Sequence, residues 1–311
     1  MFTKTLIAMI TAAAAISAMP AAIAQDGETT TDTQAAKSGY IEANGLDYYY
    51  EVHGAGEPLL LLHGGLGTTD MFDAVLPALT AEREVIAVDL HGHGRTVLGD
   101  RDIDLIDMGN DMSVILNELG YDKVDAMGYS MGGGVAFRLA VQHPEMVRRL
   151  VLVSTGFARD GFYPGILEQQ AQVAADMAEM MKNTPMYQSY AAVAPHPEDF
   201  PKLLDSMGAL MSKPYNWAED VKTLKMPVML VYGDSDMYRP EHIVEFYQFL
   251  GGGLRDAGWQ REHMSKNRLA ILPNLTHYDI FLAPQLTDTV LSFLMSESTV
   301  KSWAEQVEEG R

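Results

Sequence analysis

The sequence predicts an α/β fold in which a mainly parallel, eight-stranded sheet is flanked by helices. Continuous apolar runs of strand length supply six of the strands, at residues 59–62, 85–88, 124–127, 150–153, 228–231 and 269–272. Amphipathic runs with helical spacing separate them, at residues 71–79, 103–119, 135–142, 242–250 and 286–294. Strands that are apolar on both faces and alternate with helices are typical of a parallel sheet covered on both sides.

Two more strands are expected before these runs. Asn44 and Gly45 lie between two segments that contain Tyr and Ile, and an Asn-Gly pair in this setting is a strong hairpin signal. We therefore expect two antiparallel strands within residues 39–54, and we place the start of the folded chain near Gly39.

The composition is that of a soluble globular protein. Of 311 residues, 47% are hydrophobic and 21% are charged, and the formal net charge is −20. This acidic balance argues against nucleic-acid binding, because phosphate backbones repel it, and it favours a neutral or weakly charged substrate. Cysteine is absent, which excludes disulfides, thiolate metal sites and a cysteine nucleophile.

The amino terminus has the parts of a secretory signal peptide. Lys4 supplies a positive charge, residues 6–15 are apolar, and small residues end at Ala24. A serine and a proline interrupt the apolar run, which is too short for a span of about 20 residues. We expect cleavage after Ala24, no membrane span afterwards, and a periplasmic or secreted protein. Residues 25–38, which have no large apolar side chain, are expected to form a disordered tether.

A candidate nucleophile follows the third apolar run. The sequence GYSMG at residues 128–132 lies between a predicted strand and a predicted helix. A G-x-S-x-G pattern in this position places the serine on a sharp, strained turn, and glycines are needed because a Cβ would collide with neighbouring backbone. Ser130 is therefore the candidate nucleophile.

A serine hydroxyl needs a base to take its proton and a third group to orient that base. His277 follows the last predicted strand, where an imidazole can reach over the sheet. The acid is expected at a strand end between these two residues, and the run at 228–231 continues into Gly-Asp-Ser-Asp. We choose Asp236, with Asp234 as the alternative, and expect one of the two to form a turn.

A hydrolase of this kind also needs donors for the oxyanion that develops on the carbonyl oxygen. The glycine-rich segment HGGLG at residues 63–67 follows the first apolar run and is well suited to present backbone N–H groups. We assign the oxyanion hole to the amides of Gly65 and Met131. His63 is expected to hold this loop by hydrogen bonding and not to transfer protons.

These motifs together resemble the α/β-hydrolase superfamily, in particular serine esterases and lipases with a helical cap. The resemblance covers residues 39–295 and rests on HGGLG at 63–67, VIAVDLHGHGRT at 85–96, GYSMGG at 128–133, GDSD at 233–236 and PNLTHY at 273–278. It implies that Asp89 and Arg95 hold loops, which accounts for His91 and His93 without a metal site. Members with an aspartate at the elbow are epoxide hydrolases or dehalogenases, and Ser130 argues against both.

The resemblance also implies the domain organisation. Residues 39–156 and 225–296 would form the α/β-hydrolase core, residues 157–224 an inserted helical cap over the site, and residues 297–311 a C-terminal tail. A second insertion at residues 251–267 is expected to be a mobile loop near His277. The residues expected to line an adaptable, apolar substrate pocket are Leu66, Tyr129, Met177, Met181, Met207, Met211, Tyr187 and Trp217.

The sequence thus predicts a serine hydrolase that cleaves carboxylic esters, with lactones as a further possibility, through an acyl-enzyme intermediate. The triad would be Ser130, Asp236 and His277, the substrate a small molecule, and no cofactor or metal is expected. Serine hydrolases with the same triad also cleave C–C bonds in diketones or peptides at an N-terminal proline. A ligand sensor without turnover is a further alternative on this fold.

Overall fold

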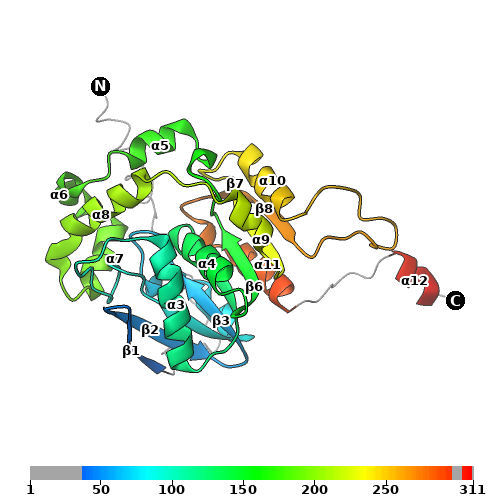
Figure 1. Cartoon of the computed structure of the whole chain (residues 1–311), viewed down its shortest axis with the longest axis horizontal. Coiled ribbons are helices and arrows are strands. Elements are labelled where there is room, and N and C mark those ends of the chain that lie inside the picture. Colours follow the sequence, from blue (N-terminus) through cyan, green and yellow to red (C-terminus); the bar gives the residue numbers. More distant parts are fainter. Residues whose placement is uncertain (1–36, 296–302, 310–311) are drawn as a thin grey trace, which may run out of the picture.

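The computed structural model describes residues 37–295 and 303–309. The predicted signal peptide and residues 25–36 of the predicted tether lie outside these residues, so both remain predictions. The described chain forms one eight-stranded sheet with helices on both sides (Figure 1).

Six strands of the sheet are parallel, and the two at its start form the predicted antiparallel hairpin. The strands are β1 (Lys37–Ala43), β2 (Leu46–Gly54), β3 (Glu57–Leu62), β4 (Arg83–Val88), β5 (Val124–Tyr129), β6 (Val147–Val153), β7 (Val228–Ser235) and β8 (Arg268–Thr276). Their order across the sheet is β1-β2-β4-β3-β5-β6-β7-β8. Strand β1 begins two residues before the predicted start of the folded chain.

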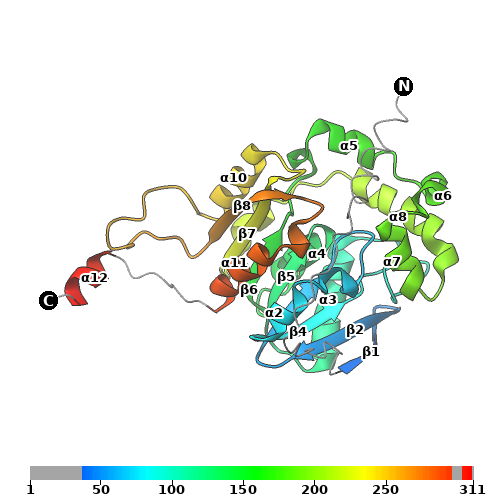
Figure 2. The ribbon, with the colours of Figure 1, turned by 180° about the vertical axis from the view of Figure 1, so that it is seen from behind.

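Helices cover both faces of the sheet, as the continuous apolar strands predict. They are α2 (Leu76–Thr80), α3 (Leu105–Leu119), α4 (Met131–Gln142), α10 (Pro240–Phe249) and α11 (Pro284–Leu294). Successive strand residues point to opposite faces, so Leu60 and Leu62 pack with α3, α4 and α10, while Leu59 and Leu61 pack with α2 and α11. Helices α3 and α4 lie in front of the sheet in Figure 1, and α2 and α11 lie in front in Figure 2.

One predicted helix is broken. The run at residues 71–79 forms a short 3-10 helix, η1 (Thr69–Phe72), and then α2. Pro77 lies in the first turn of α2. Because proline has no N–H for a bond to the preceding turn, it suits the start of a helix and not its continuation.

A helical segment is inserted between β6 and β7. It contains η2 (Arg159–Gly161), α5 (Pro164–Gln170), η3 (Ala175–Met177), α6 (Ala178–Met181), α7 (Pro185–Val193), η4 (Pro197–Asp199), α8 (Phe200–Ser212) and α9 (Ala218–Thr223). Helices α5 to α8 lie together at one side of the molecule in both views, and we call them the cap helices (Figures 1 and 2). Helix α9 instead contacts α4 and α10 of the core, although the predicted cap extends to residue 224.

The second insertion does not lie where it was expected. Residues 251–267 connect α10 to the start of β8, whereas His277 follows the end of that strand. A strand of this length separates the two by roughly 30 Å. The insertion projects away from the body, and Trp259 contacts Trp303 of α12 (Trp303–Glu309) at a ring-centroid distance of 4.7 Å (Figure 1). The expectation of a loop near His277 is therefore wrong.

The described residues contain no helix long and apolar enough to cross a membrane.

A buried charge cluster joins the strands at the amino ends of the parallel sheet. The Asp125 carboxylate on β5 is fully buried and receives hydrogen bonds from Arg83 at 2.5 Å and Arg148 at 2.9 Å. The Arg83 side chain is itself almost completely buried, so its charge has little access to water. Removing one partner of a buried ion pair leaves the other charge uncompensated.

We predict that Asp125→Ala lowers the free energy of unfolding by about 3–5 kcal/mol, because Arg83 would remain buried without its carboxylate. Urea denaturation followed by circular dichroism measures this loss. Lys182→Ala, which removes an exposed pair with Glu179, is the control and should leave the midpoint unchanged. Equal midpoints for the two variants would contradict the prediction.

Candidate active site

Ser130 lies on a tight turn between β5 and α4. Its backbone has φ 52° and ψ −114°, a conformation that non-glycine residues rarely adopt. A Cβ on Gly132 would lie 2.4 Å from the carbonyl oxygens of Leu62 and His63, and one on Gly128 would lie 2.2 Å from the Gly132 oxygen. The turn therefore has the steric requirement for glycine that the sequence predicts.

His277 lies within hydrogen-bond distance of Ser130 and Asp236. Its Nε2 is 3.0 Å from Ser130 Oγ, and its Nδ1 is 3.2 Å from Asp236 Oδ1. When Nδ1 carries the proton and donates it to the carboxylate, Nε2 is free to accept the serine proton. His277 and Asp236 are buried, whereas Ser130 is partly exposed. The three side chains thus form one hydrogen-bonded line that ends on an accessible hydroxyl.

The Asp236 carboxylate is well supplied with donors. Its Oδ2 accepts a hydrogen bond from Ser154 Oγ at 2.5 Å, and its Oδ1 accepts one from the Tyr238 amide at 3.3 Å. Burial raises the pKa of Asp236, but the hydrogen bond and charge of His277, with these two donors, outweigh it and hold the pKa below its ordinary value. The carboxylate therefore stays ionised at neutral pH.

Asp234, the alternative acid, lies elsewhere. It belongs to β7, its side chain is exposed, and it accepts a hydrogen bond from Ser235 Oγ at 3.4 Å. The geometry thus brings Asp236 to His277.

The glycine-rich loop lies directly against the serine turn. A Cβ on Gly64 would lie 3.4 Å from the Ser130 Cβ, and one on Gly65 would lie 4.0 Å from the Met131 Cβ. Met131 is the first residue of α4, where a backbone N–H has no partner within the helix and the helix dipole favours negative charge. The two amides assigned to the oxyanion hole therefore come from neighbouring backbone segments.

His63 holds this loop and is neutral. Its Nε2 accepts a hydrogen bond from the Leu90 amide at 2.9 Å, so Nε2 carries no proton. Its Nδ1 then donates to the Gly64 carbonyl at 2.7 Å. Burial lowers the pKa of His63, although the charges of Asp89 and Asp70 and the bond to Gly64 oppose the shift. These contacts agree with the predicted structural role.

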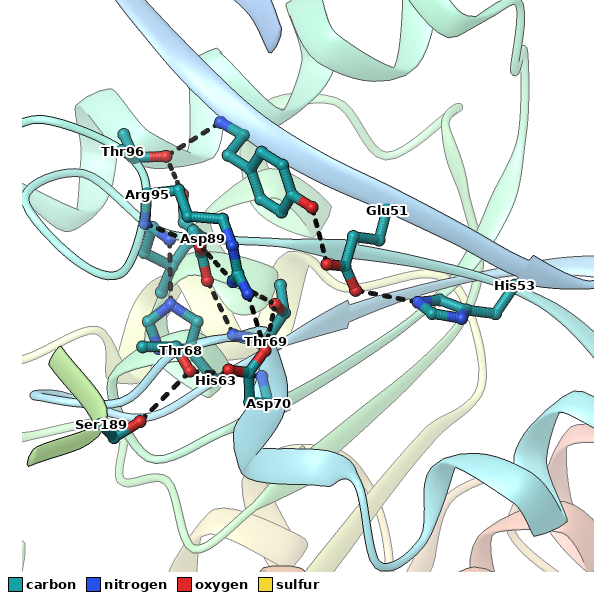
Figure 3. A network of polar contacts seen from close by, with 12 residues as sticks. Glu51, His53, His63, Thr68, Thr69, Asp70, Asp89, Arg95, Thr96 and Ser189 are labelled. Atoms are coloured by element: carbon teal, nitrogen blue, oxygen red, sulfur yellow. Dashed lines mark hydrogen bonds and ion pairs between the residues drawn. The ribbon is translucent and has the colours of Figure 1, made fainter. Parts of the chain in front are cut away.

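A polar network around Asp89 fixes the rest of the loop (Figure 3). The buried Asp89 carboxylate accepts hydrogen bonds from the Thr69 amide at 2.7 Å and from the Arg95 amide at 2.8 Å. The Arg95 guanidinium also contacts Asp89 and Asp70. Asp89 therefore ties the turn after β4 to η1, which is the loop-holding role that the family resemblance implies.

His91 and His93 each contact a backbone carbonyl. His91 Nε2 lies 2.6 Å from the Leu98 oxygen, and His93 Nδ1 lies 2.8 Å from the His91 oxygen. Burial lowers the pKa of His93 to about 3. Both side chains thus contribute to the turn that ends β4.

Two of the residues expected to bind substrate lie at the glycine-rich loop. Met207 of α8 is buried, and its terminal methyl lies 2.8 Å from where a Cβ on Gly65 would be. Leu66 belongs to the loop itself and has a φ of 59°. Met207 therefore brings α8, one of the cap helices, into contact with the glycine-rich loop.

Tyr129 has a different contact from the one expected. It is buried, and its hydroxyl donates to the His277 carbonyl oxygen at 2.5 Å. Its ring also lies 5.3 Å from the His277 ring. Tyr129 thus holds the backbone of His277 in place by this hydrogen bond.

The remaining pocket candidates pack within the cap or against the core. Trp217 stacks on Phe137 of α4 with 5.3 Å between ring centroids, and Tyr187 contacts Phe200. Met181 is buried, while Met177 and Met211 are half-buried and pack against the main core cluster. Trp217 thus attaches the inserted segment to the core, and Tyr187 packs within the inserted segment.

An open pocket of about 340 Å³ adjoins the acid. It is lined by Tyr163, Gly165, Ile166, Gln169, Ser235, Asp236, Met237 and Tyr278. Sequence reasoning missed this set, apart from Asp236, although the position of Tyr278 directly after His277 was a usable signal. It also missed Ser154, whose contact with Asp236 depends on the register between β6 and β7.

Residues 57–180 match the family model described as alpha/beta hydrolase fold. A protein of Azorhizobium caulinodans that carries the name of a carbamate hydrolase is 36% identical over 137 residues, which span 43% of this chain and 51% of that protein. The pimeloyl-[acyl-carrier protein] methyl ester esterase of Legionella pneumophila is 24% identical over 251 residues, which span 76% of this chain and 97% of that protein.

The structure is also similar to a solved one. The crystal structure of the carboxylesterase CesB from Bacillus subtilis superposes with a TM-score of 0.65 and 19% identity, and the match covers 84% of this chain and 92% of that one. At this identity the likeness shows the fold alone. The family model covers the serine turn and the glycine-rich loop, and the sheet order agrees with the fold. This chain therefore has the α/β-hydrolase fold, and residues 57–180 match the sequence model of that family.

Proposed function

We propose that this chain is a serine hydrolase that cleaves carboxylic esters, lactones included, through an acyl-enzyme intermediate. The observation that carries the proposal is the line of hydrogen bonds from Asp236 through His277 to Ser130. The line ends on a partly exposed hydroxyl beside two backbone amides, which is the geometry that acyl transfer requires. The names of the similar methyl ester esterase and carboxylesterase support the same reaction class.

In the first step, Ser130 Oγ attacks the ester carbonyl carbon while His277 Nε2 takes the hydroxyl proton. The electron pair of the carbonyl bond moves onto its oxygen, and the Gly65 and Met131 amides stabilise that charge. Loss of one such donor raises a barrier by roughly 3 kcal/mol. The ionised Asp236 stabilises the imidazolium and keeps its Nδ1 proton in place.

In the second step, the tetrahedral intermediate collapses and His277 Nε2 gives its proton to the leaving alkoxide, which departs as an alcohol. A water molecule, deprotonated by the same nitrogen, then attacks the acyl-enzyme and releases the carboxylic acid. With a lactone, the alcohol and the acid remain in one product. No redox step or co-reactant other than water is needed.

The surroundings of the site favour a neutral substrate with an apolar acyl group. Met207 covers the Gly65 side of the serine, and a flexible thioether adapts to acyl groups of different shapes. A net charge of −20 disfavours anionic substrates.

Ser130→Ala should reduce the kcat/KM for p-nitrophenyl butyrate by at least about 10³-fold, because the nucleophile is lost. The folded state should persist, as judged by circular dichroism and thermal unfolding. Ser113→Ala, which removes a buried hydroxyl in α3 that bonds to the Asn110 carbonyl, serves as the matched control. Activity of Ser130→Ala near that of the wild type would refute the proposed nucleophile.

Asp236→Asn should reduce kcat by about 10³- to 10⁴-fold, because an amide no longer orients His277 in the productive tautomer. Asp234→Asn is the matched control, since it makes the same change two residues away on the exposed side chain of Asp234, and it should leave kcat close to the wild-type value. The opposite ranking of these two variants would transfer the role to Asp234.

The reaction class is testable with a panel of p-nitrophenyl esters of increasing acyl length, lactones of several ring sizes, a vinylogous diketone and a prolyl p-nitroanilide. We expect steady turnover of esters or lactones, with higher kcat/KM for apolar acyl groups. Preferential cleavage of the diketone or the prolyl amide would replace the ester assignment. A single burst without further turnover would favour the ligand sensor.

A further inference from the structure

Ser154 is the residue that follows β6, and it lies between the nucleophile strand and the acid strand. Its side chain is fully buried, and its backbone has φ 51°, in the left-handed region that disfavours residues with a Cβ. Its amide donates to the Val231 carbonyl of β7 at 2.8 Å. A strained serine in such a position needs a compensating contact.

That contact is with the acid. Ser154 Oγ donates to Asp236 Oδ2 at 2.5 Å, while the other carboxylate oxygen faces His277 Nδ1 at 3.2 Å and the Tyr238 amide at 3.3 Å. The two oxygens of the carboxylate therefore have separate partners. A carboxylate with only one oxygen fixed is free to rotate about its Cβ–Cγ bond.

We propose that Ser154 is a positioning residue for the hydrolytic reaction: its hydroxyl locks the Asp236 carboxylate in the rotamer that presents Oδ1 to His277. This inference rests on the proposed function, because it assumes that Asp236 and His277 act on Ser130. Ser154 touches neither the substrate nor the reacting atoms and acts through Asp236.

The same turn also fixes the nucleophile. The Ser130 amide donates to the Val153 carbonyl at 2.9 Å, and Thr155 Oγ1 donates to the Ser130 carbonyl at 3.1 Å. Three successive residues at the end of β6 thus contact the two flanking members of the triad. The strain at Ser154 is explained by this arrangement, since its side chain must point to β7 while its neighbours contact the turn after β5.

Removing the hydroxyl has a defined electrostatic consequence. A buried carboxylate that loses a donor is less stable as an anion and binds a neighbouring positive charge more strongly. The imidazolium of His277 is that neighbour. Four phenols also feel the Asp236 charge: Tyr129, Tyr232, Tyr238 and Tyr278. Burial is the main cause that raises the pKa of each, and the Asp236 charge adds to it, so all four remain neutral.

The test is the pH profile of kcat/KM for p-nitrophenyl butyrate in Ser154→Ala and Ser154→Gly. We expect a loss of about tenfold at neutral pH, the typical effect of one hydrogen bond to a charged group. The acid limb should also move to higher pH in both variants, because the proton on His277 is held more tightly. Glycine relieves the strained φ that alanine keeps, so Ser154→Gly should unfold at a higher temperature than Ser154→Ala, and comparing the two variants separates loss of the hydroxyl from backbone strain.

A double-variant cycle identifies the partner. In the Asp236→Asn background, Ser154→Ala should have little further effect on kcat, because its only route of action is already lost. Ser113→Ala is the matched loss of a buried hydroxyl and should leave the pH profile unchanged. Additive losses in the cycle, or an unmoved acid limb in both Ser154 variants, would overturn the inference. If Asp236→Asn itself keeps full activity, the proposed triad fails instead, so the two failures are distinguishable.

Discussion

The parallel alignment of β5, β6, β7 and β8 is the constraint on which the candidate site depends. Because the strands run in one direction and pair in sequence, their carboxyl ends lie side by side. The residues that follow these ends are Ser130, Ser154, Asp236 and His277. Side chains from distant parts of the chain thus meet within hydrogen-bond distance without any long-range loop having to fold over the sheet.

The amino ends of the parallel strands also contain a buried carboxylate, but its partners are of a different kind. At the amino ends of the strands, the buried Asp125 is surrounded by arginines, and its charge is neutralised within the cluster. At the carboxyl ends, Asp236 is buried with His277 and neutral donors. Only the second arrangement pairs the carboxylate with an imidazole, the side chain that most often serves as a general base. The two buried carboxylates therefore lie at opposite ends of the strands: Asp125 joins strands through arginines, and Asp236 contacts the candidate catalytic histidine.

Much of this arrangement was predictable from local sequence patterns. Apolar runs locate the strands, and Ser130, Asp236 and His277 each lie within five residues of the end of a run. Ser154 was not predictable, because its bond to Asp236 depends on the register between β6 and β7. The contacts of Trp217 and Tyr187 could not be predicted either, since helical spacing predicts which side of a helix is buried but not which residues pack against that side. The position of residues 251–267 could have been predicted, because the segment precedes β8 whereas His277 follows it, so the two lie at opposite ends of that strand.

The inserted helices have a consequence for how such a protein can diversify. Helices α5 to α8 are inserted in the sequence between β6 and β7, the strands that Ser154 and Asp236 directly follow, and Met207 of α8 contacts the glycine-rich loop. The strand ends and the inserted helices are thus separate stretches of the chain. Under the proposed function, mutations in the cap helices would change which acyl group is accepted, while the residues at the strand ends would be inherited unchanged.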